Sequence, residues 1–549
     1  MATSVSVNGH DAAPPAPPKK LLNHIVDDMA REKPDVLYAE IPLSPTSFDA
    51  GFRRVTYRAL ANAINGMAWW LHRTLGPGQN FETLLYIGPN DLRHNILILG
   101  AVKAGYKMLF TSPRYSPLAQ VNLIRLVGCK TMLVPEARPP AIDGILESCE
   151  MRVHRIPSLE DLFDQRNPHY PFEKTFAQAR SEPLVVLHTS GTTGLPKPII
   201  WTHDWAASFA GERMLAPPPG FDSSDRLLLG TRILSLMPPF HGAHIFASIM
   251  FAIFNQTTTI YPLSAVPPSA EMIVECLKHT TADAITLVPP YVEQIGRSPE
   301  ILEYLSQNIE TIFWAGGDIS LAAGDAISSM IKLFTTCGST EMGMWPTLRR
   351  SGKWPSEHWK FMKIHPAANI EFRQRSDDLY EAFVNRNADY EHEQPVFKIF
   401  TDAQEFSSGD LFSPHPSDPQ LWQYCGRSDD MQVFSSGEKY HPVSVEQRIG
   451  HHPEVQEALL VGTRRPQAAL LLEMKAGTPL ETAEQRAEAV ARVWPVVEEA
   501  NQMCPTYAKI TKERILFVEP QRPMVRGAKG TVHRWATVHL YREELDGLL

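Results

Sequence analysis

Short apolar runs alternate with amphipathic stretches from residue 21 to about residue 425, and this alternation constrains the fold more than any other feature of the sequence. Such runs are typical of buried β-strands, and the longer amphipathic stretches between them are typical of helices. Strands that alternate with helices usually pair in parallel, with the helices covering the sheet faces. The sequence therefore predicts an α/β fold. The strand-like runs include TLLYIG (83–88), KMLFTS (107–112), CKTMLVP (129–135), AITLVPP (284–290) and ETIFWAGG (310–317), and RHNILILGAVKAG (93–105) is a helical stretch between the first two.

The length indicates more than one domain. At 549 residues the chain exceeds what a single hydrophobic core usually supports. The character of the sequence changes near residues 424–442, and the strands and helices that follow suit a small α+β domain. We expect a large N-terminal region over residues 21–427 and a small C-terminal domain over residues 428–549. The proline-rich residues 1–20 are typical of a disordered leader.

Composition and charge exclude several classes of protein. The net charge of −9, with no block of like charges, argues against a nucleic-acid-binding protein. The six cysteines are scattered without CxxC spacing, as in a reduced intracellular protein. No secretory signal is visible, and the longest apolar run, Ile245 to Phe254, is about half of the roughly 20 residues that span a bilayer. We expect a cytoplasmic protein with no nucleic-acid partner and no membrane partner.

A glycine- and hydroxyl-rich loop follows one of the strand-like runs. Residues 184–198 read LVVLHTSGTTGLPKP, and the loop ends near Lys197. Glycines allow backbone N–H groups to turn towards an anion, hydroxyls add donors, and a lysine adds a point charge. The Walker pattern is not met, because Pro196 stands where that pattern has its second glycine. We expect a phosphate-binding loop of another kind, formed by Thr189, Ser190, Gly191, Thr192, Thr193 and Gly194.

Further motifs follow in a fixed order, and together they resemble a known superfamily. They are MPPFHGAHIF (237–246), TIFWAGGDIS (311–320), TTCGSTEMG (335–343), EFSSGDLF (405–412), GRSDDMQVFSSGEKYHP (426–442) and PMVRGAKGTVHR (523–534). From about residue 50 to the end, the chain resembles the adenylate-forming superfamily of acyl-CoA synthetases, luciferases and nonribosomal peptide synthetase (NRPS) adenylation domains. It is most similar to fungal NRPS-like enzymes, including carboxylic acid reductases. The resemblance implies that a carboxylic acid reacts with Mg-ATP to give an acyl-adenylate and pyrophosphate, and is then captured as a thioester.

The resemblance assigns a nucleotide role to several residues. Lys197 and the loop would hold the β and γ phosphates of ATP. Glu341 is a hard oxygen ligand suited to Mg²⁺, with the hydroxyl of Thr192 or Thr193 assisting. Asp410 would accept hydrogen bonds from the ribose hydroxyls, and Arg427 would support the ribose or phosphate region. The nucleotide site would be completed by Ala315, Gly316 and Gly317 beside the adenine, and by Gly338, Ser339 and Thr340.

Two residues of the small domain are implied in catalysis and movement. Lys529 aligns with the catalytic lysine of the superfamily, whose ammonium would bridge the acid oxygen and the α-phosphate. Asp429 aligns with the hinge about which a mobile small domain rotates, bringing Lys529 in for adenylation and withdrawing it for thioester formation. Plain structural readings stay open for three other residues: Glu341 as a helix-capping partner, Asp410 as a turn former and His241 as a core histidine.

The substrate pocket favours an acid without an α-amino group. Amino-acid-activating relatives usually have an aspartate where this chain has His241, and without that carboxylate an α-ammonium would be buried unpaired. An aryl acid fits best and an aliphatic acid second, and a quaternary-ammonium acid held by Trp314 or Trp345 is a third alternative. The chain also departs from the superfamily at Cys337, where an aromatic residue commonly stacks on adenine, and at Pro198 and Ser408. The predicted pocket comprises His241, Gly242, His244, Val288, Pro289, Pro290, Ala315, Gly338 and Met342.

The acyl acceptor is expected to lie outside this chain. No carrier-protein serine motif follows residue 534, and no GxGxxG motif occurs anywhere. We therefore expect an excised adenylation domain whose acyl group passes to the phosphopantetheine of a downstream carrier domain and then to a reductase domain, or else a stand-alone activating enzyme. The alternatives are an acyl- or aryl-CoA ligase and a catalytically silent nucleotide-binding module.

Overall fold

The computed structural model describes residues 20–113, 115–190, 195–213, 215–352, 355–376, 378–435, 438–527 and 530–548. The expected leader lies outside this part of the chain, apart from Lys20. Lys529 and residues 191–194 of the predicted phosphate loop also lie outside it, as does the side chain of Ser190.

The first sheet has six strands in the order β6-β5-β3-β4-β7-β8. All neighbours pair in parallel except β7 and β8, which pair antiparallel. Helices α4 (Pro117–Leu126) and α5 (Ala141–Ser148) pack on one face of this sheet through a separate apolar cluster. The strands are β3 (Thr83–Tyr86), β4 (Lys107–Phe110), β5 (Thr131–Val134), β6 (Arg152–Arg155), β7 (Pro183–Ser190) and β8 (Pro196–Thr202).

The second sheet has seven strands in the order β14-β13-β12-β10-β11-β1-β2, parallel except for the edge strand β2. Its outer face is covered by α11 (Ala270–His279), α12 (Pro289–Arg297), α13 (Pro299–Asn308) and α14 (Leu321–Ser328). The strands are β1 (Leu37–Pro42), β2 (Phe52–Thr56), β10 (Arg232–Ser235), β11 (Thr258–Ile260), β12 (Ala284–Leu287), β13 (Thr311–Trp314) and β14 (Lys332–Thr335).

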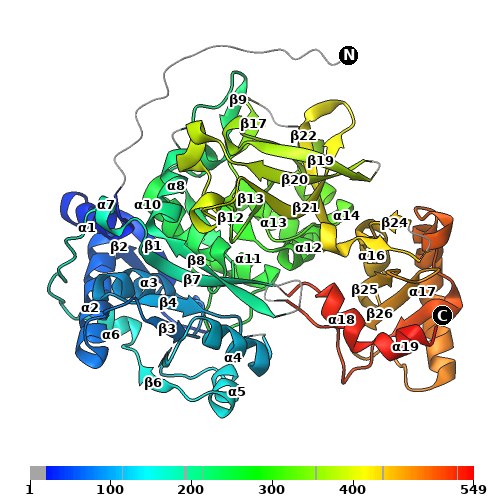
Figure 1. Ribbon diagram of the computed structural model, residues 1–549, viewed down its shortest axis with the longest axis horizontal. Coiled ribbons are helices and arrows are strands. Elements are labelled where there is room, and N and C mark those ends of the chain that lie inside the picture. The colour runs from blue at the N-terminus through cyan, green and yellow to red at the C-terminus, as the bar shows by residue number, and fades with distance from the viewer. Residues whose placement is uncertain are drawn as a thin grey trace.

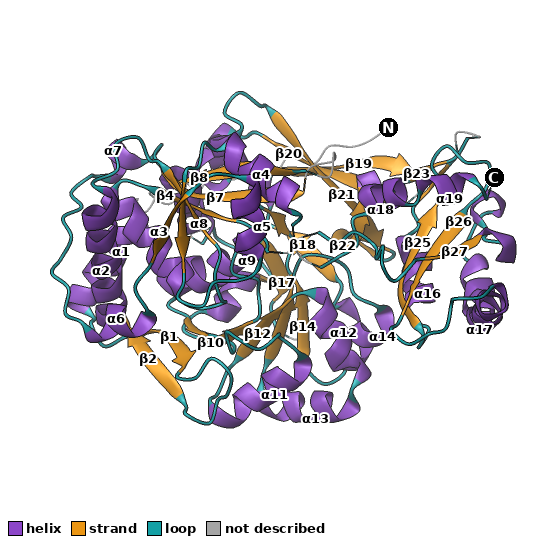
Figure 2. Ribbon diagram, turned by 90° about the horizontal axis from the view of Figure 1, so that it is seen from below, coloured by secondary structure: helices purple, strands orange, loops and turns teal. Residues whose placement is uncertain are grey.

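The two parallel sheets share the main hydrophobic core. One cluster of buried residues runs from the inner face of one sheet through a middle layer of helices to the other sheet, and Figure 2 shows the sheets lying between helical layers. The middle layer contains α1 (Leu22–Glu32), α2 (Tyr57–Leu75), α3 (Arg93–Ala104), α8 (His203–Glu212), α9 (Gly242–Ile245) and α10 (Phe251–Asn255), with a π-helical turn at Phe246–Met250; shorter helices are α6 (Leu159–Asp164), α7 (Phe176–Ala179) and α15 (Val396–Ile399).

A third, antiparallel sheet interrupts the expected alternation. Its strand order is β19-β20-β21-β22-β18-β17-β9, and its long strands are β19 (Ile370–Ser376), β20 (Leu379–Asn385), β21 (Glu405–His415) and β22 (Asp418–Arg427). Only Pro416 and Ser417 separate β21 from β22, and so short a connection joins strands only in antiparallel pairing. The shorter strands are β9 (Phe221–Ser223), β17 (Thr347–Arg350) and β18 (Phe361–Ile364).

The C-terminal residues form a separate small domain (Figure 1). It begins after β22 with a 3-10 turn at Ser428–Asp430 and has its own apolar clusters. Together with the large region, this confirms the predicted α/β class with a small α+β domain. The small domain contains β23 (Gln432–Val433), β24 (Lys439–Tyr440), α16 (Val443–Gly450), β25 (Val455–Val461), β26 (Ala469–Met474), α17 (Ala483–Asn501), β27 (Ile515–Phe517), α18 (Arg534–Leu540) and α19 (Arg542–Asp546).

Candidate functional site

The predicted phosphate loop joins two paired strands. Strands β7 and β8 form an antiparallel pair in which Thr189 lies opposite Lys197 and Ser190 lies opposite Pro196. The side chain of Thr189 is half-buried and that of Lys197 is exposed. The strand pairing therefore places the predicted lysine across from the first predicted hydroxyl, next to the segment that would hold the phosphates.

Glu341 lies on a tight turn between two short strands, β15 (Gly338–Ser339) and β16 (Gly343–Met344). A side chain at Gly338 would place its Cβ 2.2 Å from the carbonyl oxygen of Gly343, so glycine is required there. Ser339 Oγ accepts the N–H of Met342 at 3.2 Å. The carboxylate of Glu341 makes no ion pair or hydrogen bond within the described part of the chain, and the residue is half-buried. It is therefore available as an oxygen ligand.

Two tryptophans that are not among the predicted site residues hold the backbone of this turn. Trp201 Nε1 donates to the carbonyl of Thr340 at 2.7 Å, and Trp205 Nε1 donates to the carbonyl of Glu341 at 3.2 Å. The two indoles stack with their centroids 3.8 Å apart. Trp201 is the second-to-last residue of β8 and Trp205 lies in the first turn of α8, so their stacking depends on how the chain turns from strand to helix at Thr202, which no sequence periodicity shows.

Asp410, Arg427 and Asp429 form one charged group at the junction with the small domain. Arg427 Nη1 donates to Asp410 Oδ1 at 3.3 Å, and Arg427 Nε donates to Asp429 Oδ1 at 3.1 Å. Asp410 is buried, and its backbone N–H donates to Ser408 Oγ at 3.0 Å. The structure thus joins the predicted ribose carboxylate to the predicted hinge residue through a single guanidinium.

The predicted adenine loop contacts the small domain. Gly316 has a φ of +100°, which favours glycine, and Ala315, Gly316 and Gly317 follow the end of β13. The next residue, Asp318, accepts a hydrogen bond from Gln447 Nε2 of α16 at 3.4 Å, where α16 lies beside α12 and α14 (Figure 1). Burial raises the pKa of Asp318 to about 6.

Four further residues of the predicted pocket lie at the carboxyl edge of the parallel seven-stranded sheet, where ligands bind in many α/β proteins. They are His241, Val288, Pro289 and Pro290. His241 is half-buried, and its Nδ1 accepts the N–H of Ala243 at 3.2 Å, capping α9. In the neutral imidazole this acceptor role places the proton on Nε2, which is therefore a donor. Val288, Pro289 and Pro290 follow β12 and begin α12, whose first residue Pro289 lies beside Gly317.

Three residues of the predicted pocket and its surroundings are mainly packing residues. His244 is fully buried in the layer between the sheets, with its ring 5.8 Å from that of Tyr261, and burial lowers the pKa of His244 to about 3. Met342 and Cys337 are buried with Trp345 in the cluster beneath the antiparallel sheet.

The tryptophans considered for a quaternary-ammonium acid are core residues. Trp314 is buried against Trp359 with centroids 5.6 Å apart, and Trp345 stacks on Phe412 at 5.5 Å. Because both rings are enclosed by other side chains, neither offers a face to a cation. Neither tryptophan could therefore bind the ammonium group of a quaternary-ammonium acid.

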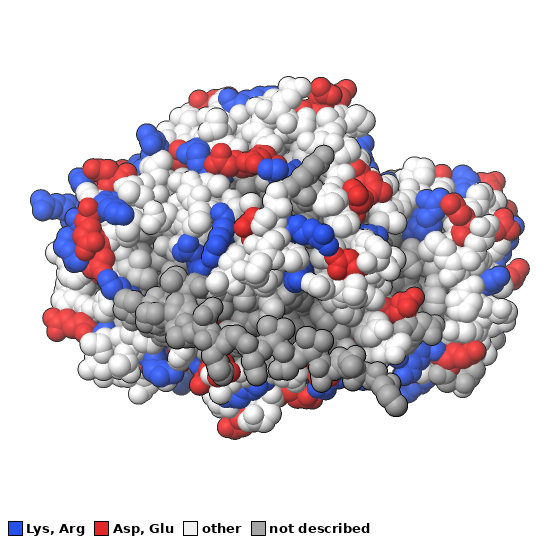
Figure 3. Space-filling view, turned by 90° about the horizontal axis from the view of Figure 1, so that it is seen from above, with Lys and Arg blue, Asp and Glu red and all other residues white. Residues whose placement is uncertain are grey.

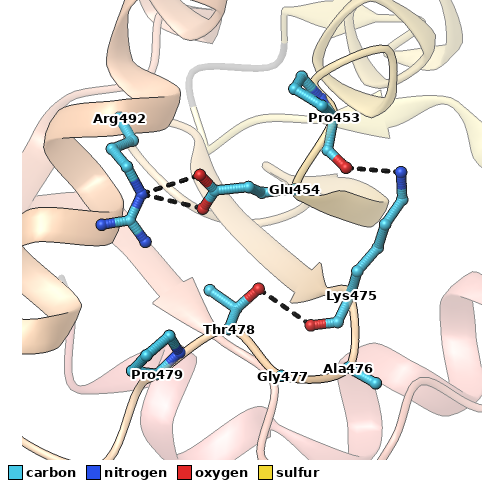
Figure 4. A pocket seen from close by; sticks show the side chains of 8 residues that line it. All are labelled: Pro453, Glu454, Lys475, Ala476, Gly477, Thr478, Pro479 and Arg492. Atoms are coloured by element: carbon cyan, nitrogen blue, oxygen red, sulfur yellow. Dashed lines mark hydrogen bonds and ion pairs between the residues drawn. The ribbon is translucent and has the colours of Figure 1, made fainter.

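Two cavities lie in other parts of the described structure, and only one of them touches a predicted pocket residue. One of about 390 Å³ lies in the small domain between α17 and the turn after β26, where Arg492 pairs with Glu454 at 2.9 Å (Figure 4), and none of the predicted site residues lines it. A second, with room for about one water molecule, lies beside Met342 and is lined by Glu212, Glu393 and Trp345. Within the described residues, no three His, Cys, Asp or Glu side chains group as a metal site, so Mg²⁺ would need phosphate or water ligands besides Glu341.

The described surface shows mixed charge. On the face in Figure 3, acidic and basic side chains are interspersed among uncharged ones. Among the described residues, no helix combines the length and the apolar character needed to cross a bilayer.

Comparisons with known proteins agree with this arrangement. The AMP-binding enzyme family matches residues 29–372, and the C-terminal domain of AMP-binding enzymes matches residues 429–549. An isocyanide synthase–NRPS hybrid of Aspergillus fumigatus is 32% identical over 96% of this chain and 33% of its own length. A carboxylic acid reductase of Neurospora crassa is 30% identical over 96% of this chain and 50% of its own length. This chain thus spans half or less of the length of these relatives.

A solved structure shows the same fold. The anthranilate CoA ligase AuaEII, in complex with anthranoyl-AMP, has a TM-score of 0.70 and 16% identity, over 97% of this chain and 99% of that one. The match to the family model extends over more than half of the chain. The chain belongs to the AMP-binding enzyme family.

Proposed function

We propose that this chain uses Mg-ATP to convert a carboxylic acid without an α-amino group, most favourably an aryl acid, into an acyl-adenylate with release of pyrophosphate. The acyl group then passes to the phosphopantetheine of a carrier domain and is reduced by a further domain. Two comparisons support this: the match to the family and the similarity to a carboxylic acid reductase.

The Glu341 turn is the observation that carries the proposal. It presents a carboxylate without a partner among the described residues, and two indole N–H groups hold the carbonyls at its base. A rigid backbone that positions one carboxylate is what a magnesium–triphosphate site requires, because Mg²⁺ is usually held by one or two carboxylates together with phosphates. A bound Mg²⁺ would neutralise charge on the phosphates.

The other residues have distinct roles in the proposed reaction. Lys197 would hold the β and γ phosphates as they leave, and Asp410 would accept hydrogen bonds from the ribose. Lys529 would neutralise charge that accumulates between the acid oxygen and the α-phosphate. Asp429 would be the hinge that brings Lys529 into the site and withdraws it.

The absence of a carboxylate at position 241 supports the substrate class. His241 carries no negative charge, and because its Nδ1 accepts from Ala243, its Nε2 would donate to an acid carboxylate and would not compensate an α-ammonium. The site would bind an aryl or aliphatic acid more tightly than an amino acid.

Hydroxylamine trapping of the acyl-adenylate, together with pyrophosphate release, tests the proposal. The assay would use ATP, Mg²⁺ and a panel of aryl, aliphatic and amino acids. We expect turnover with non-amino acids and little with amino acids. ATP binding without turnover on any acid would contradict the function. Efficient formation of an acyl-CoA with free coenzyme A would count against the carrier-dependent step.

A further inference from the structure

Three buried polar side chains lie together at the carboxyl edge of the six-stranded sheet. They are Thr111, Gln120 and His188, which are 2%, 1% and 6% exposed. Thr111 Oγ1, Gln120 Oε1 and His188 Nε2 have no hydrogen-bond partner within the described part of the chain. We call these three side chains the polar recess.

The strand pairing brings these residues together. Leu109 of β4 lies opposite Val186 of β7, so continuing this register by two residues places Thr111 beside His188. Paired residues of parallel strands have their side chains on the same face, and here that face is the one covered by α4.

Tyr115 connects two members of the polar recess, His188 and Gln120. Its hydroxyl lies 3.0 Å from His188 Nδ1, and its carbonyl accepts from Gln120 Nε2 at 3.2 Å. These contacts use one polar atom of each partner and leave His188 Nε2 and Gln120 Oε1 for another group.

The polar recess adjoins the predicted acid pocket. The ring of His188 is nearly parallel to that of Phe240, at 20° and with centroids 6.5 Å apart, and Phe240 immediately precedes His241. One residue before His188, Leu187 lies 3.6 Å from the position that a Cβ at Gly242 would take. Leu187 and His188 point to opposite faces of β7, so the link between the polar recess and the pocket is the ring of Phe240, which lies against His188.

Unpaired buried polar atoms lower the stability of the folded protein unless another group forms hydrogen bonds with them. An unsatisfied buried polar atom costs about 1–3 kcal/mol, and native proteins contain few of them. The polar recess also carries no charge, since burial lowers the pKa of His188 to about 4 and the other two groups do not ionise. Its two oxygens accept hydrogen bonds, so it suits an uncharged donor such as a hydroxyl or a carboxamide.

We propose that a substituent of the acid reaches the polar recess, so that the enzyme selects acids bearing an uncharged hydrogen-bonding group, a hydroxyl or a carboxamide. The inference rests on the proposed activation of a non-amino acid and names its substrate class more closely. Thr111 and His188 are then specificity-determining residues. Sites that hydrogen-bond a substrate group discriminate strongly against analogues that lack it, because their own polar atoms are left unpaired.

The test compares matched acids. Pyrophosphate release would be measured with benzoate, its three hydroxy isomers, 4-carbamoylbenzoate, hexanoate and 6-hydroxyhexanoate. We expect kcat/KM for the best hydroxylated or carbamoylated acid to exceed that of its unsubstituted counterpart by about tenfold or more. Thr111→Val and His188→Phe should reduce this ratio about tenfold while kcat/KM for the unsubstituted acid stays within about threefold.

Thr131→Val is the matched control for the threonine variant. Thr131 is also a buried threonine of this sheet, but its hydroxyl accepts from Arg152 at 3.1 Å and should not affect selectivity. Thr111→Val is nearly isosteric and keeps the proposal testable if His188→Phe folds poorly. Equal kcat/KM for substituted and unsubstituted acids would show that the polar recess holds only water and would overturn the proposal. The proposal would also be overturned if Thr111→Val impaired only thioester transfer and left the selectivity of adenylation unchanged.

A binding measurement separates this inference from the proposed function. Benzoyl and hydroxybenzoyl sulfamoyl adenosines resemble the acyl-adenylate and need no turnover. Tighter binding of a hydroxylated analogue that disappears in Thr111→Val, without turnover of any acid, would support the polar recess and contradict the proposed reaction. Turnover of acids with no preference for hydroxylated or carbamoylated ones would support the proposed reaction and contradict the role of the polar recess.

Discussion

Asp410 and Asp429 lie on opposite sides of one guanidinium, that of Arg427, at 3.3 Å and 3.1 Å. Asp410 is the predicted ribose ligand, and Asp429 lies in the turn that leads into the small domain. A ribose that hydrogen-bonds Asp410 would compete for the carboxylate that Arg427 contacts. Nucleotide binding would thereby change the electrostatic environment of the predicted hinge.

Replacing Asp410 by asparagine should weaken ATP binding. The substitution keeps the size of the side chain but removes a charged acceptor, and hydrogen bonds to charged groups contribute about 1.5–3 kcal/mol. We expect the KM for ATP to rise about tenfold or more in pyrophosphate-release assays. Asp418→Asn is the control, since Asp418 pairs with Arg350 at the opposite end of β22. A KM for ATP that is unchanged in Asp410→Asn would argue for a turn-forming role only.

Replacing Glu341 by glutamine should raise the Mg²⁺ requirement. The variant retains an oxygen but loses the negative charge that a hard cation prefers. We expect the Mg²⁺ concentration for half-maximal activity to increase about tenfold. Glu357→Gln, an exposed site, should not change it. The assignment would be refuted by a normal Mg²⁺ titration of Glu341→Gln.

Replacing His241 by aspartate should suppress activation of non-amino acids. A carboxylate at this position would repel the acid carboxylate, and we expect kcat/KM to fall at least about tenfold. His241→Asn keeps a neutral donor and should retain most of the activity. The measurement is acid-dependent pyrophosphate release, and equal losses in the two variants would indicate a packing role for the histidine.

Replacing Lys529 by alanine should separate the two half-reactions. An ammonium contact at about 4 Å contributes about 4 kcal/mol at an effective dielectric constant of 20, so adenylation should fall about a hundredfold or more. Transfer from a preformed acyl-adenylate to a pantetheine thiol should be spared. Lys509→Ala, at an exposed position of the small domain, is the control. Equal loss of both half-reactions would exclude the assigned role.

Glu212 should make stability depend on pH. Burial raises its pKa well above the usual value of 4.5, and Asp225 and Glu393 add negative charge nearby. Since the folded state holds this proton more tightly, the contribution to stability is present below pH 4.5 and declines as the pH rises through the raised pKa. We expect Glu212→Gln to exceed the wild-type Tm by about 2 °C or more at pH 8 and by less at pH 5.

The control for this prediction is Glu488→Gln, an exposed carboxylate on α17. It should leave the Tm difference between pH 5 and pH 8 unchanged. If Glu212→Gln behaves like this control, Glu212 is not held in its neutral form.

The sequence predicted the parallel sheets more completely than the rest of the fold. Their strands are continuous apolar runs because both faces are covered, and such runs are visible without a structure. The antiparallel sheet escaped prediction because β21 and β22 mix polar and apolar residues, and because EFSSGDLF, which resembles a turn, is itself the first part of β21. The same limit applies to the site: Glu341 and Asp410 are recognisable from their motifs, but Trp201 and Trp205 matter through contacts made 139 and 136 residues away.

The antiparallel pairing of β7 with β8 has a consequence for how the phosphates are neutralised. In a Walker-type loop a helix starts directly after the glycines, and its dipole contributes positive potential to the phosphates. Here a strand follows, with Lys197 as its second residue, so in the proposed reaction that potential would have to come from the lysine side chain and a divalent ion. Triphosphate binding in this protein should therefore depend steeply on ionic strength.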